Sequence, residues 1–266
     1  MKNILHDIIE HKRREIAERK ELYPIKLLEK SLYFASTPVS LRTYLNRPDK
    51  VGIIAEIKRR SPSKGDINTY VSVERLSLGY MQAGASALSI LTDSKFFGGK
   101  NDDLTIGRKF NFCPILRKDF MIDPYQVLEA KSIGADVILL IAAALSPQLT
   151  KELAALAKSL GMEVLLEVHN GYEIETHLCE GVDLLGVNNR DLTTFSVSTS
   201  ISEELVEKIP SHLTKITESG ISDAETIVRL KKLGYQGFLI GETFMKTPKP
   251  EVTCRRLIEQ VEALQG

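Results

Sequence analysis

The chain has 266 residues, which is enough for one large α/β domain or two small ones. Its 35 Lys and Arg residues balance 35 Asp and Glu residues, so no overall field draws it to nucleic acid or to an anionic membrane. We therefore expect neither partner. Apolar residues make up 43% and charged residues 26%, as in ordinary globular proteins.

Three classes of segment are missing from the sequence. The longest apolar run, VILLIAAAL at 137–145, is far shorter than the roughly 20 residues of a membrane-spanning helix. The N-terminus carries both signs of charge, unlike a signal or transit peptide, which predicts a cytoplasmic location. The three Cys residues form no Cys-x-x-Cys pair and the five His residues no His-x-x-x-His pair. We expect reduced structural cysteines and no metal site.

Residues 1–48 are predicted to form an N-terminal helical extension of two or three helices packed on the following domain. Ile4, Leu5, Ile8, Ile9 and Ile16 have mostly helical spacing and alternate with charged residues. No later stretch is rich enough in Pro, Gly or Ser to mark a linker. Residues 49–266 are therefore expected to form the main body of a single domain.

A repeated pattern runs through residues 49–266. The segments AGASALSIL, IGADVILLI, EGVDLLGV and LGYQGFLI each place a Gly between a helix-like segment and a short apolar run, and LGMEVLLEV is a looser copy. Gly allows the left-handed turn that ends many helices, and the apolar run is typical of a strand buried on both faces. The marker glycines are Gly84, Gly134, Gly161, Gly181 and Gly234.

Completing this pattern predicts eight strands alternating with helices. The helices begin with Ser, Asp or Pro, as helices commonly do. Eight such units predict a (β/α)8 TIM barrel. An open doubly wound sheet is the competing fold, but it favours a Gly-rich turn after the first strand, where this chain has KRRSPSKG. The strands are expected near 51–57, 86–91, 114–118, 136–141, 163–168, 183–187, 213–217 and 237–241.

Charged and amide side chains collect near the carboxyl ends of four predicted strands. Because strand side chains alternate, residues of equal parity share one face of the sheet. A ring of buried charges is costly unless it is compensated or functional, and this end of the barrel is where catalysis occurs in the fold. The alternative is that strand ends are simply more hydrated. The aligned residues are Glu56 and Lys58, Lys118 and Phe120, Glu167 and His169, and Asn188 and Arg190.

Two later segments suit a phosphate group. ITESGIS places Ser219 and Gly220 after the seventh strand, and LIGETFM places Gly241 and Glu242 after the eighth, at the start of a short helix. Glycines allow backbone N–H groups to approach an anion, and these two loops form the usual phosphate site of such barrels. Each Gly alone could be simple turn chemistry.

Several of these motifs together resemble the indole-3-glycerol phosphate synthase family of tryptophan biosynthesis. The resemblance extends in order from about Val51 to Met245, and the helical extension fits the family too. It implies a small phosphorylated substrate, 1-(2-carboxyphenylamino)-1-deoxyribulose 5-phosphate, which undergoes ring closure with loss of CO2 and water and without a cofactor. The matching segments are IIAEIKRRSPSKG, ILRKDFMIDPYQVLEAKSIGADVILLI, LLEVHN, LLGVNNRDL and ITESGIS.

The resemblance also implies a role for each matching residue. Lys118 resembles the general acid that protonates the carbonyl oxygen, Lys58 the partner of the substrate carboxylate, and Glu167 the acid/base group of the dehydration. Glu56, Asn188 and Ser219 match the other polar residues of the site. The residues implied for phosphate are Ser61, Gly220, Gly241 and Glu242, and those for the anthranilate ring are Pro62, Phe97 and Phe120.

Elementary chemistry adds three expectations. An anionic substrate in a neutral chain needs local cations, which Lys58, Lys118 and Arg190 supply. Glu56 and Lys58 are expected to pair. Because a nearby acid raises the pKa of a lysine, we predict that the general acid Lys118 lies farther from a carboxylate than Lys58 does.

Lys100, where the family commonly has a small polar residue such as Ser, either adds a cation to the site or is a solvated loop lysine.

Three other functions remain open from the residues. A lysine at a strand end suits a Schiff-base aldolase, a related barrel could be a phosphoribosyl isomerase, and a barrel of this kind could bind phosphate without catalysis. The expected oligomeric state is a monomer, with a weak dimer as the alternative.

Overall fold

A computed structural model describes residues 4–191 and 194–266. Residues 1–3 of the expected extension and Leu192 of the LLGVNNRDL motif therefore lie outside the described residues. No helix in the described ranges is long and apolar enough to cross a membrane.

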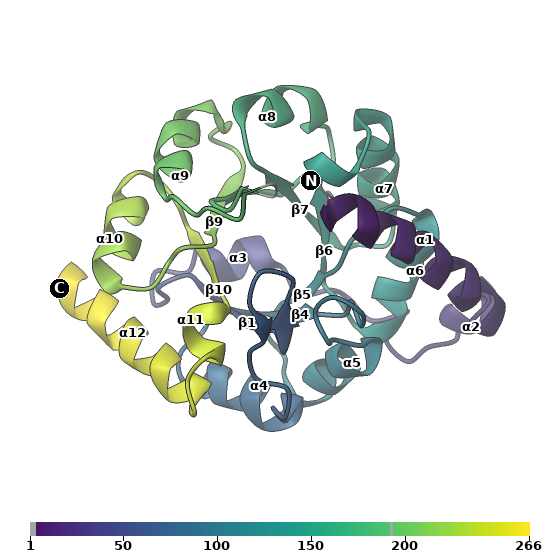
Figure 1. The fold of residues 1–266 in the computed structure, drawn as a ribbon, viewed down its shortest axis with the longest axis horizontal. Coiled ribbons are helices and arrows are strands. Elements are labelled where there is room, and N and C mark those ends of the chain that lie inside the picture. Colours follow the sequence, from purple (N-terminus) through teal and green to yellow (C-terminus); the bar gives the residue numbers. More distant parts are fainter. Residues whose placement is uncertain (1–3, 192–193) are drawn as a thin grey trace.

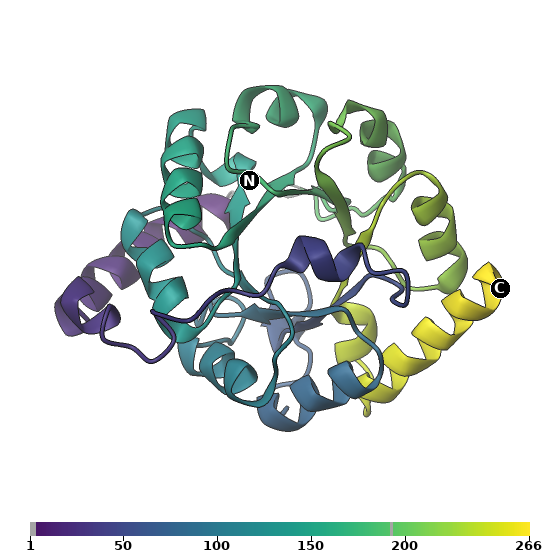
Figure 2. The same ribbon diagram turned by 180° about the vertical axis from the view of Figure 1, so that it is seen from behind.

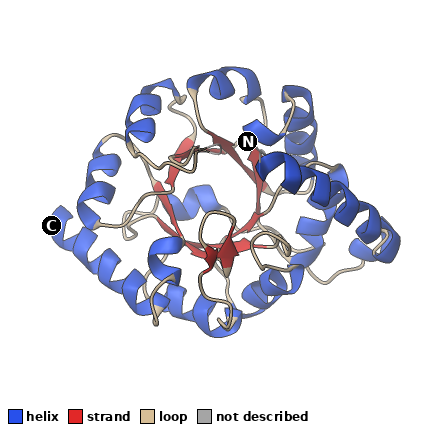
Figure 3. Cartoon of the chain, viewed as in Figure 1, coloured by secondary structure: helices blue, strands red, loops and turns tan. Residues whose placement is uncertain are grey.

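Eight parallel strands form a closed barrel in the order β1-β10-β9-β8-β7-β6-β5-β4, surrounded by helices (Figures 1 and 3). The ring closes at β1, where Ile54 pairs with Ala87 on one side and with Leu239 on the other. The TIM-barrel prediction is confirmed, and the open doubly wound sheet is excluded. The strands are β1 (Ile53–Ile57), β4 (Ala87–Leu91), β5 (Ile115–Lys118), β6 (Val137–Ile141), β7 (Glu163–Val168), β8 (Leu184–Asn188), β9 (Thr214–Glu218) and β10 (Gly237–Ile240).

The outer helices begin and end at the predicted signals. Side chains of Ser72, Asp123, Ser146 and Asp223 each accept a backbone N–H at a helix start. All five marker glycines have φ in the left-handed region, which explains their repetition. The helices are α4 (Val73–Gln82), α5 (Asn101–Phe110), α6 (Pro124–Ile133), α7 (Pro147–Ser159), α8 (Gly171–His177), α9 (Ser200–Leu205), α10 (Ala224–Lys232), α11 (Glu242–Met245) and α12 (Pro250–Gln265), with short 3-10 turns η1 (Ala142–Ala144) and η2 (Val206–Lys208).

Alternation along the strands produces two apolar cores. Outward-facing side chains such as Ile53 and Leu166 pack against the ring of helices. Inward-facing side chains such as Ile54 and Leu165 fill the barrel together with Leu41 of the N-terminal segment. The barrel interior is therefore packed below the carboxyl ends of its strands, as expected for the fold.

Three helices precede the barrel: α1 (Ile4–Leu22), α2 (Ile25–Leu28) and α3 (Leu41–Leu45). Figure 2 shows α3 crossing one end of the barrel, where Leu41 and Leu45 join the inner core. Helix α1 lies at the opposite end, because Lys12 contacts Asp93 and Asp119, which lie one or two residues after the ends of β4 and β5. The N-terminal segment therefore contacts both ends of the barrel.

A small hairpin after β1 was not predicted. Its strands, β2 (Arg60–Ser61) and β3 (Gly65–Asp66), pair antiparallel and enclose the SPSKG turn, which lies over the barrel mouth in Figure 1. Arg59 ties this hairpin to the loop after β4, donating to Gly98 O over 3.2 Å, and to α5, donating to Asp103 Oδ1 over 3.0 Å. Two-residue strands carry too little pattern to be recognised in the sequence.

Candidate active site

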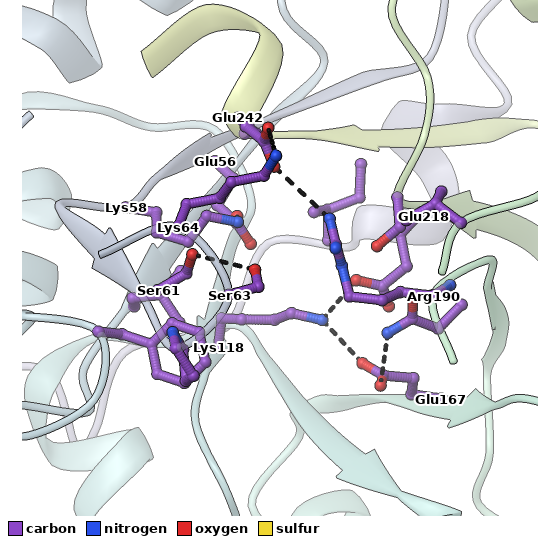
Figure 4. Close-up of a pocket in the computed structure, with 18 of the residues that line it drawn as sticks. Glu56, Lys58, Ser61, Ser63, Lys64, Lys118, Glu167, Arg190, Glu218 and Glu242 are labelled. Atoms are coloured by element: carbon purple, nitrogen blue, oxygen red, sulfur yellow. Dashed lines mark hydrogen bonds and ion pairs between the residues drawn. The ribbon is translucent and has the colours of Figure 1, made fainter. Parts of the chain in front are cut away.

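A cavity of about 430 Å³ opens at the carboxyl ends of the barrel strands (Figure 4). Every predicted site residue contributes to its lining, although the residues come from seven separate segments of the chain. The lining includes Glu56, Lys58, Ser61, Pro62, Phe97, Lys118, Phe120, Glu167, Asn188, Arg190, Ser219, Gly220, Gly241 and Glu242.

Lys118 lies at the centre of the cavity and contacts two carboxylates. Its Nζ is 2.8 Å from Glu167 Oε2 and 2.7 Å from Glu218 Oε2. Asn188 Nδ2 donates to the other oxygen of Glu167 over 3.0 Å. Three strands, β5, β7 and β9, thus converge on one ammonium group, and Figure 4 shows the two dashed contacts of Lys118.

Glu218 was missed from the sequence. It is the last residue of β9 and is buried, with only 4% of its surface exposed. The signal was available, because Glu218 shares the parity of Ile216, which faces the barrel interior. The alternation of side chains that we used on four other strands also places Glu218 on the inner face of β9.

The two carboxyl groups titrate differently because their surroundings differ. Burial and the neighbouring charge of Glu167 raise the pKa of Glu218 to about 8. Lys118 acts in the opposite direction but does not cancel this rise. Burial also tends to raise the pKa of Glu167, but Lys118 and His169 outweigh it and lower this pKa. These opposite directions favour a protonated Glu218 beside an ionised Glu167.

The two lysines do not show the expected contrast in their distance to a carboxylate. The nearest carboxylate oxygen is 2.7 Å from Lys118 and 2.6 Å from Lys58, and Lys118 has two such neighbours. Burial would lower the pKa of Lys118, but Glu167 and Glu218 together raise it. The prediction failed because Glu218 approaches from β9 across the closed barrel, a neighbour that the strand carrying Lys118 does not reveal.

Glu56 and Lys58 form the predicted ion pair along β1. Glu56 is buried, whereas the side chain of Lys58 is 19% exposed and reaches the cavity. Gly241 packs directly on Glu56, and a Cβ atom at this position would collide with the carboxylate. The glycine is therefore required for close packing as well as for any approach of an anion.

Another part of the cavity wall, formed by the hairpin turn and the loops after β8, β9 and β10, carries hydroxyl, N–H and cationic groups. Glu242 Oε2 is 3.5 Å from Arg190 Nη2, and its Oε1 is 3.6 Å from Lys64 Nζ of the hairpin turn (Figure 4). Ser219 and Gly220 both have positive φ values, of 69° and 75°, so this loop is tightly turned. Lys64 was not predicted, because a lysine in a polar turn is usually only a solvated side chain.

An apolar slot completes the site. The rings of Phe97 and Phe120 lie 5.9 Å apart, centroid to centroid, and Ile8 of α1 also lines the cavity. Asp93 accepts the backbone N–H of Phe97 over 3.2 Å. Lys100, by contrast, is exposed and does not line the cavity, as expected for a loop lysine.

A closed barrel with a charged cavity at the carboxyl ends of its strands defines the class of (β/α)8-barrel enzymes. The family model of indole-3-glycerol phosphate synthase matches residues 5–257. The chain belongs to the indole-3-glycerol phosphate synthase family. A relative of that name from Bacteroides thetaiotaomicron is 45% identical over 98% of this chain and 100% of its own length. Another, from Caldanaerobacter subterraneus, is 41% identical over 91% of this chain and 93% of its own.

Solved structures with much lower sequence identity share the fold. Thiamine phosphate pyrophosphorylase from Pyrococcus furiosus is 17% identical with a TM-score of 0.60, covering 85% of this chain and 100% of its own. A mutant tryptophan synthase alpha-subunit from the same organism is 15% identical with a TM-score of 0.60, covering 81% and 99%. At such identities the likeness concerns the fold alone.

Proposed function

We propose that the chain converts 1-(2-carboxyphenylamino)-1-deoxyribulose 5-phosphate into indole-3-glycerol phosphate, CO2 and water. The observation that carries the proposal is Lys118 held between Glu167 and Glu218, opposite a wall suited to phosphate. One cation flanked by an ionised and a protonated carboxyl group can supply and remove protons at neighbouring atoms of a substrate.

The cavity accommodates the two ends of such a substrate. Arg190, Lys64 and the tight loop at Gly220 provide cations and backbone N–H groups for the phosphate. The apolar slot lined by Phe97 and Phe120 suits an aromatic ring. Lys58 then lies within the same cavity as a counter-ion for the ring carboxylate, and it is held by Glu56.

The chemistry is assigned to the central cluster. Lys118 gives a proton to the carbonyl oxygen as the ring carbon attacks, and the bond to the carboxylate breaks to release CO2. The new hydroxyl leaves as water with the proton shared by Glu167 and Glu218, and the pair takes a proton from the adjacent CH2 carbon. One solvent proton restores Lys118, so atoms and charge balance.

A Schiff-base aldolase is the less favoured assignment. Imine formation needs a neutral amine, whereas the contact with ionised Glu167 raises the pKa of Lys118 and keeps it protonated. A carboxylate pair that holds one proton also serves a dehydration better than an imine exchange.

Replacing Lys118 tests the general-acid role. Lys118→Met should lower kcat by at least about 100-fold, because the proton donor for ring closure is lost. The product indole fluorescence reports turnover directly, and the chain contains no Trp to obscure it. The matched control is Lys151→Met, on the exposed face of α7, which should keep the wild-type rate. A Lys118→Met variant with wild-type kcat would contradict the assignment, and an inactive wild-type chain would contradict the function itself.

Four further expectations remain predictions: a cytoplasmic location, a monomeric state, independence from any cofactor, and the division between an extension at 1–48 and a barrel at 49–266. The proposed reaction is redox-neutral and balances with protons alone. This balance supports the expectation of no cofactor.

A further inference from the structure

His169 lies beside the catalytic cluster but has no role in the mechanism above. It follows Glu167 by two residues along the chain, so both side chains point to the same face. Its Nε2 is 3.7 Å from Glu167 Oε1, and its Nδ1 is 3.3 Å from Glu173 Oε2. The imidazole ring, with only 12% of its side chain exposed, is therefore held between two carboxylates.

Glu173 is a well-anchored partner for this ring. Its backbone N–H donates to Asn170 Oδ1 over 2.9 Å, while Asn170 Nδ2 donates to Glu173 Oε1 over 3.1 Å. The backbone N–H of His169 also donates to Glu173 Oε2 over 2.7 Å. The first turn of α8 thus fixes the carboxylate that faces Nδ1, and the ring orientation follows from it.

The other ring nitrogen points at the active site. Nε2 of His169 is buried and makes no hydrogen bond within residues 4–191 and 194–266. Its nearest carboxylate is Glu167, whose Oε1 already accepts from Asn188. Buried polar nitrogens are normally satisfied, so an unpaired one aimed at a catalytic carboxylate requires an explanation.

We propose that His169 is a positioning residue which, anchored by Glu173, supplies Glu167 with a second positive charge beside that of Lys118. This inference rests on the proposed function. The charge keeps Glu167 ionised and the shared proton on Glu218, so that the pair begins each cycle with its proton on the correct carboxyl group. The arrangement resembles other sites in which one carboxylate orients a histidine toward a second group.

The electrostatics around the ring agree with this role. Burial would lower the pKa of His169, but the hydrogen bond to Glu173 and the charge of Glu167 outweigh burial and raise it. Glu218 of β9 acts in the same direction. Two cations lie near this cluster: Lys118 of β5, which contacts Glu167 and Glu218, and Lys208 of η2, which lies beside Gly171 at the start of α8.

Two variants test the charge of His169 while retaining the hydrogen-bonding shape of the altered side chain. His169→Gln keeps a donor toward Glu167 without the charge, and Glu173→Gln lowers the pH at which the imidazole loses its proton. The matched control is Glu175→Gln, an exposed position on the same helix. For each protein, kcat and KM are measured between about pH 5.5 and 9.

The ratio of wild-type kcat to His169→Gln kcat should be about tenfold at low pH and approach one as His169 deprotonates, with KM changed less than about twofold. In Glu173→Gln, His169 loses its proton at a lower pH, so its contribution to kcat should disappear at a lower pH than in the wild type. A pH-independent ratio would mean a purely structural role and would overturn the proposal, as would unchanged kcat in both variants.

A second measurement does not depend on turnover. The imidazole resonances of the five His residues, with His169 assigned by its loss in His169→Gln, report its protonation by NMR. The midpoint for His169 should match the pH at which the kcat ratio changes and should fall in Glu173→Gln. A midpoint unaffected by Glu173→Gln would overturn the proposal even if a variant folds poorly. If the wild type is active but the ratio of wild-type kcat to His169→Gln kcat does not change with pH, the proposed function stands and only this inference is refuted.

Discussion

Glu218 is the active-site carboxyl group whose surroundings favour its protonated form. Its pKa is raised by burial and by the charge of Glu167, whereas the pKa of Glu167 is lowered by Lys118 despite burial. Like charges forced together rarely both ionise, so the pair divides into an acid and a base.

This division predicts an alkaline limit to turnover. Because Glu218 has a pKa of about 8, it loses the shared proton above that pH, and wild-type kcat should fall. Glu218→Gln should reduce kcat about 100-fold and remove this decline, because the amide does not titrate. Steady-state kinetics from pH 6 to 10 measure both effects, with exposed Glu207→Gln as the control. An alkaline limb that persists in Glu218→Gln would assign the titration to another group.

At the scale of elements, α1 is coupled to the active site through one buried ion cluster. Lys12 is 1% exposed, and its Nζ lies 3.0 Å from Asp93 and 2.9 Å from Asp119. Asp93 in turn accepts the N–H of Phe97, and Asp119 accepts that of Phe120 over 2.8 Å. One lysine therefore holds both loops that carry the aromatic slot.

Removing this lysine should weaken both stability and substrate binding. Lys12→Met removes the cation shared by two buried carboxylates, of which Asp119 keeps its contact with Arg117, and removing one partner of a buried ion pair costs about 3–5 kcal/mol in similar cases. We expect a lower Tm and a KM raised several-fold, since the aromatic slot loosens, with a smaller change in kcat. Thermal unfolding and indole fluorescence test this, with Arg13→Met, a surface pair with Glu10, as the control. An unchanged KM would separate α1 from the slot.

For the whole molecule, buried carboxyl groups of two kinds set the pH dependence of stability. Cations lower the pKa values of Asp119, Glu129 and Glu167 although burial opposes them, so these groups contribute stability above their unfolded pKa values, and it is lost as pH falls. Glu218 acts with the opposite sign. Its pKa is raised from the ordinary 4.5 to about 8 in the folded protein. It therefore contributes stability that is fully present below about pH 4.5 and is lost as the pH rises toward 8.

The two contributions together predict a stability maximum on the acidic side of neutrality, near pH 5. Urea unfolding from pH 3 to 9 measures the free energy of unfolding, and roughly 0.5 M NaCl screens surface repulsion without affecting buried pairs. Glu218→Gln should flatten the decline between pH 5 and 8. Stability that rises steadily from pH 5 to 8 in the wild type would contradict this account.

The sequence by itself determined the order and kind of the elements. Helix caps, left-handed glycines and apolar runs are local signals, since each depends on a few adjacent residues, and they located the barrel strands closely. Parity then placed Glu56, Lys118, Glu167 and Asn188 on the inner face. The family motifs supplied the remaining predicted site residues, all of which line the cavity.

Only the tertiary structure decided which side chains meet. Closure of the barrel brings Glu218 of β9 to Lys118 of β5. Folding of the N-terminal segment brings Lys12 to Asp93 and Asp119. Both contacts join residues far apart in the chain, and no local pattern encodes the distance between them. Because pKa values depend on burial and on such neighbours, the protonation of the site could not be predicted until the barrel was closed.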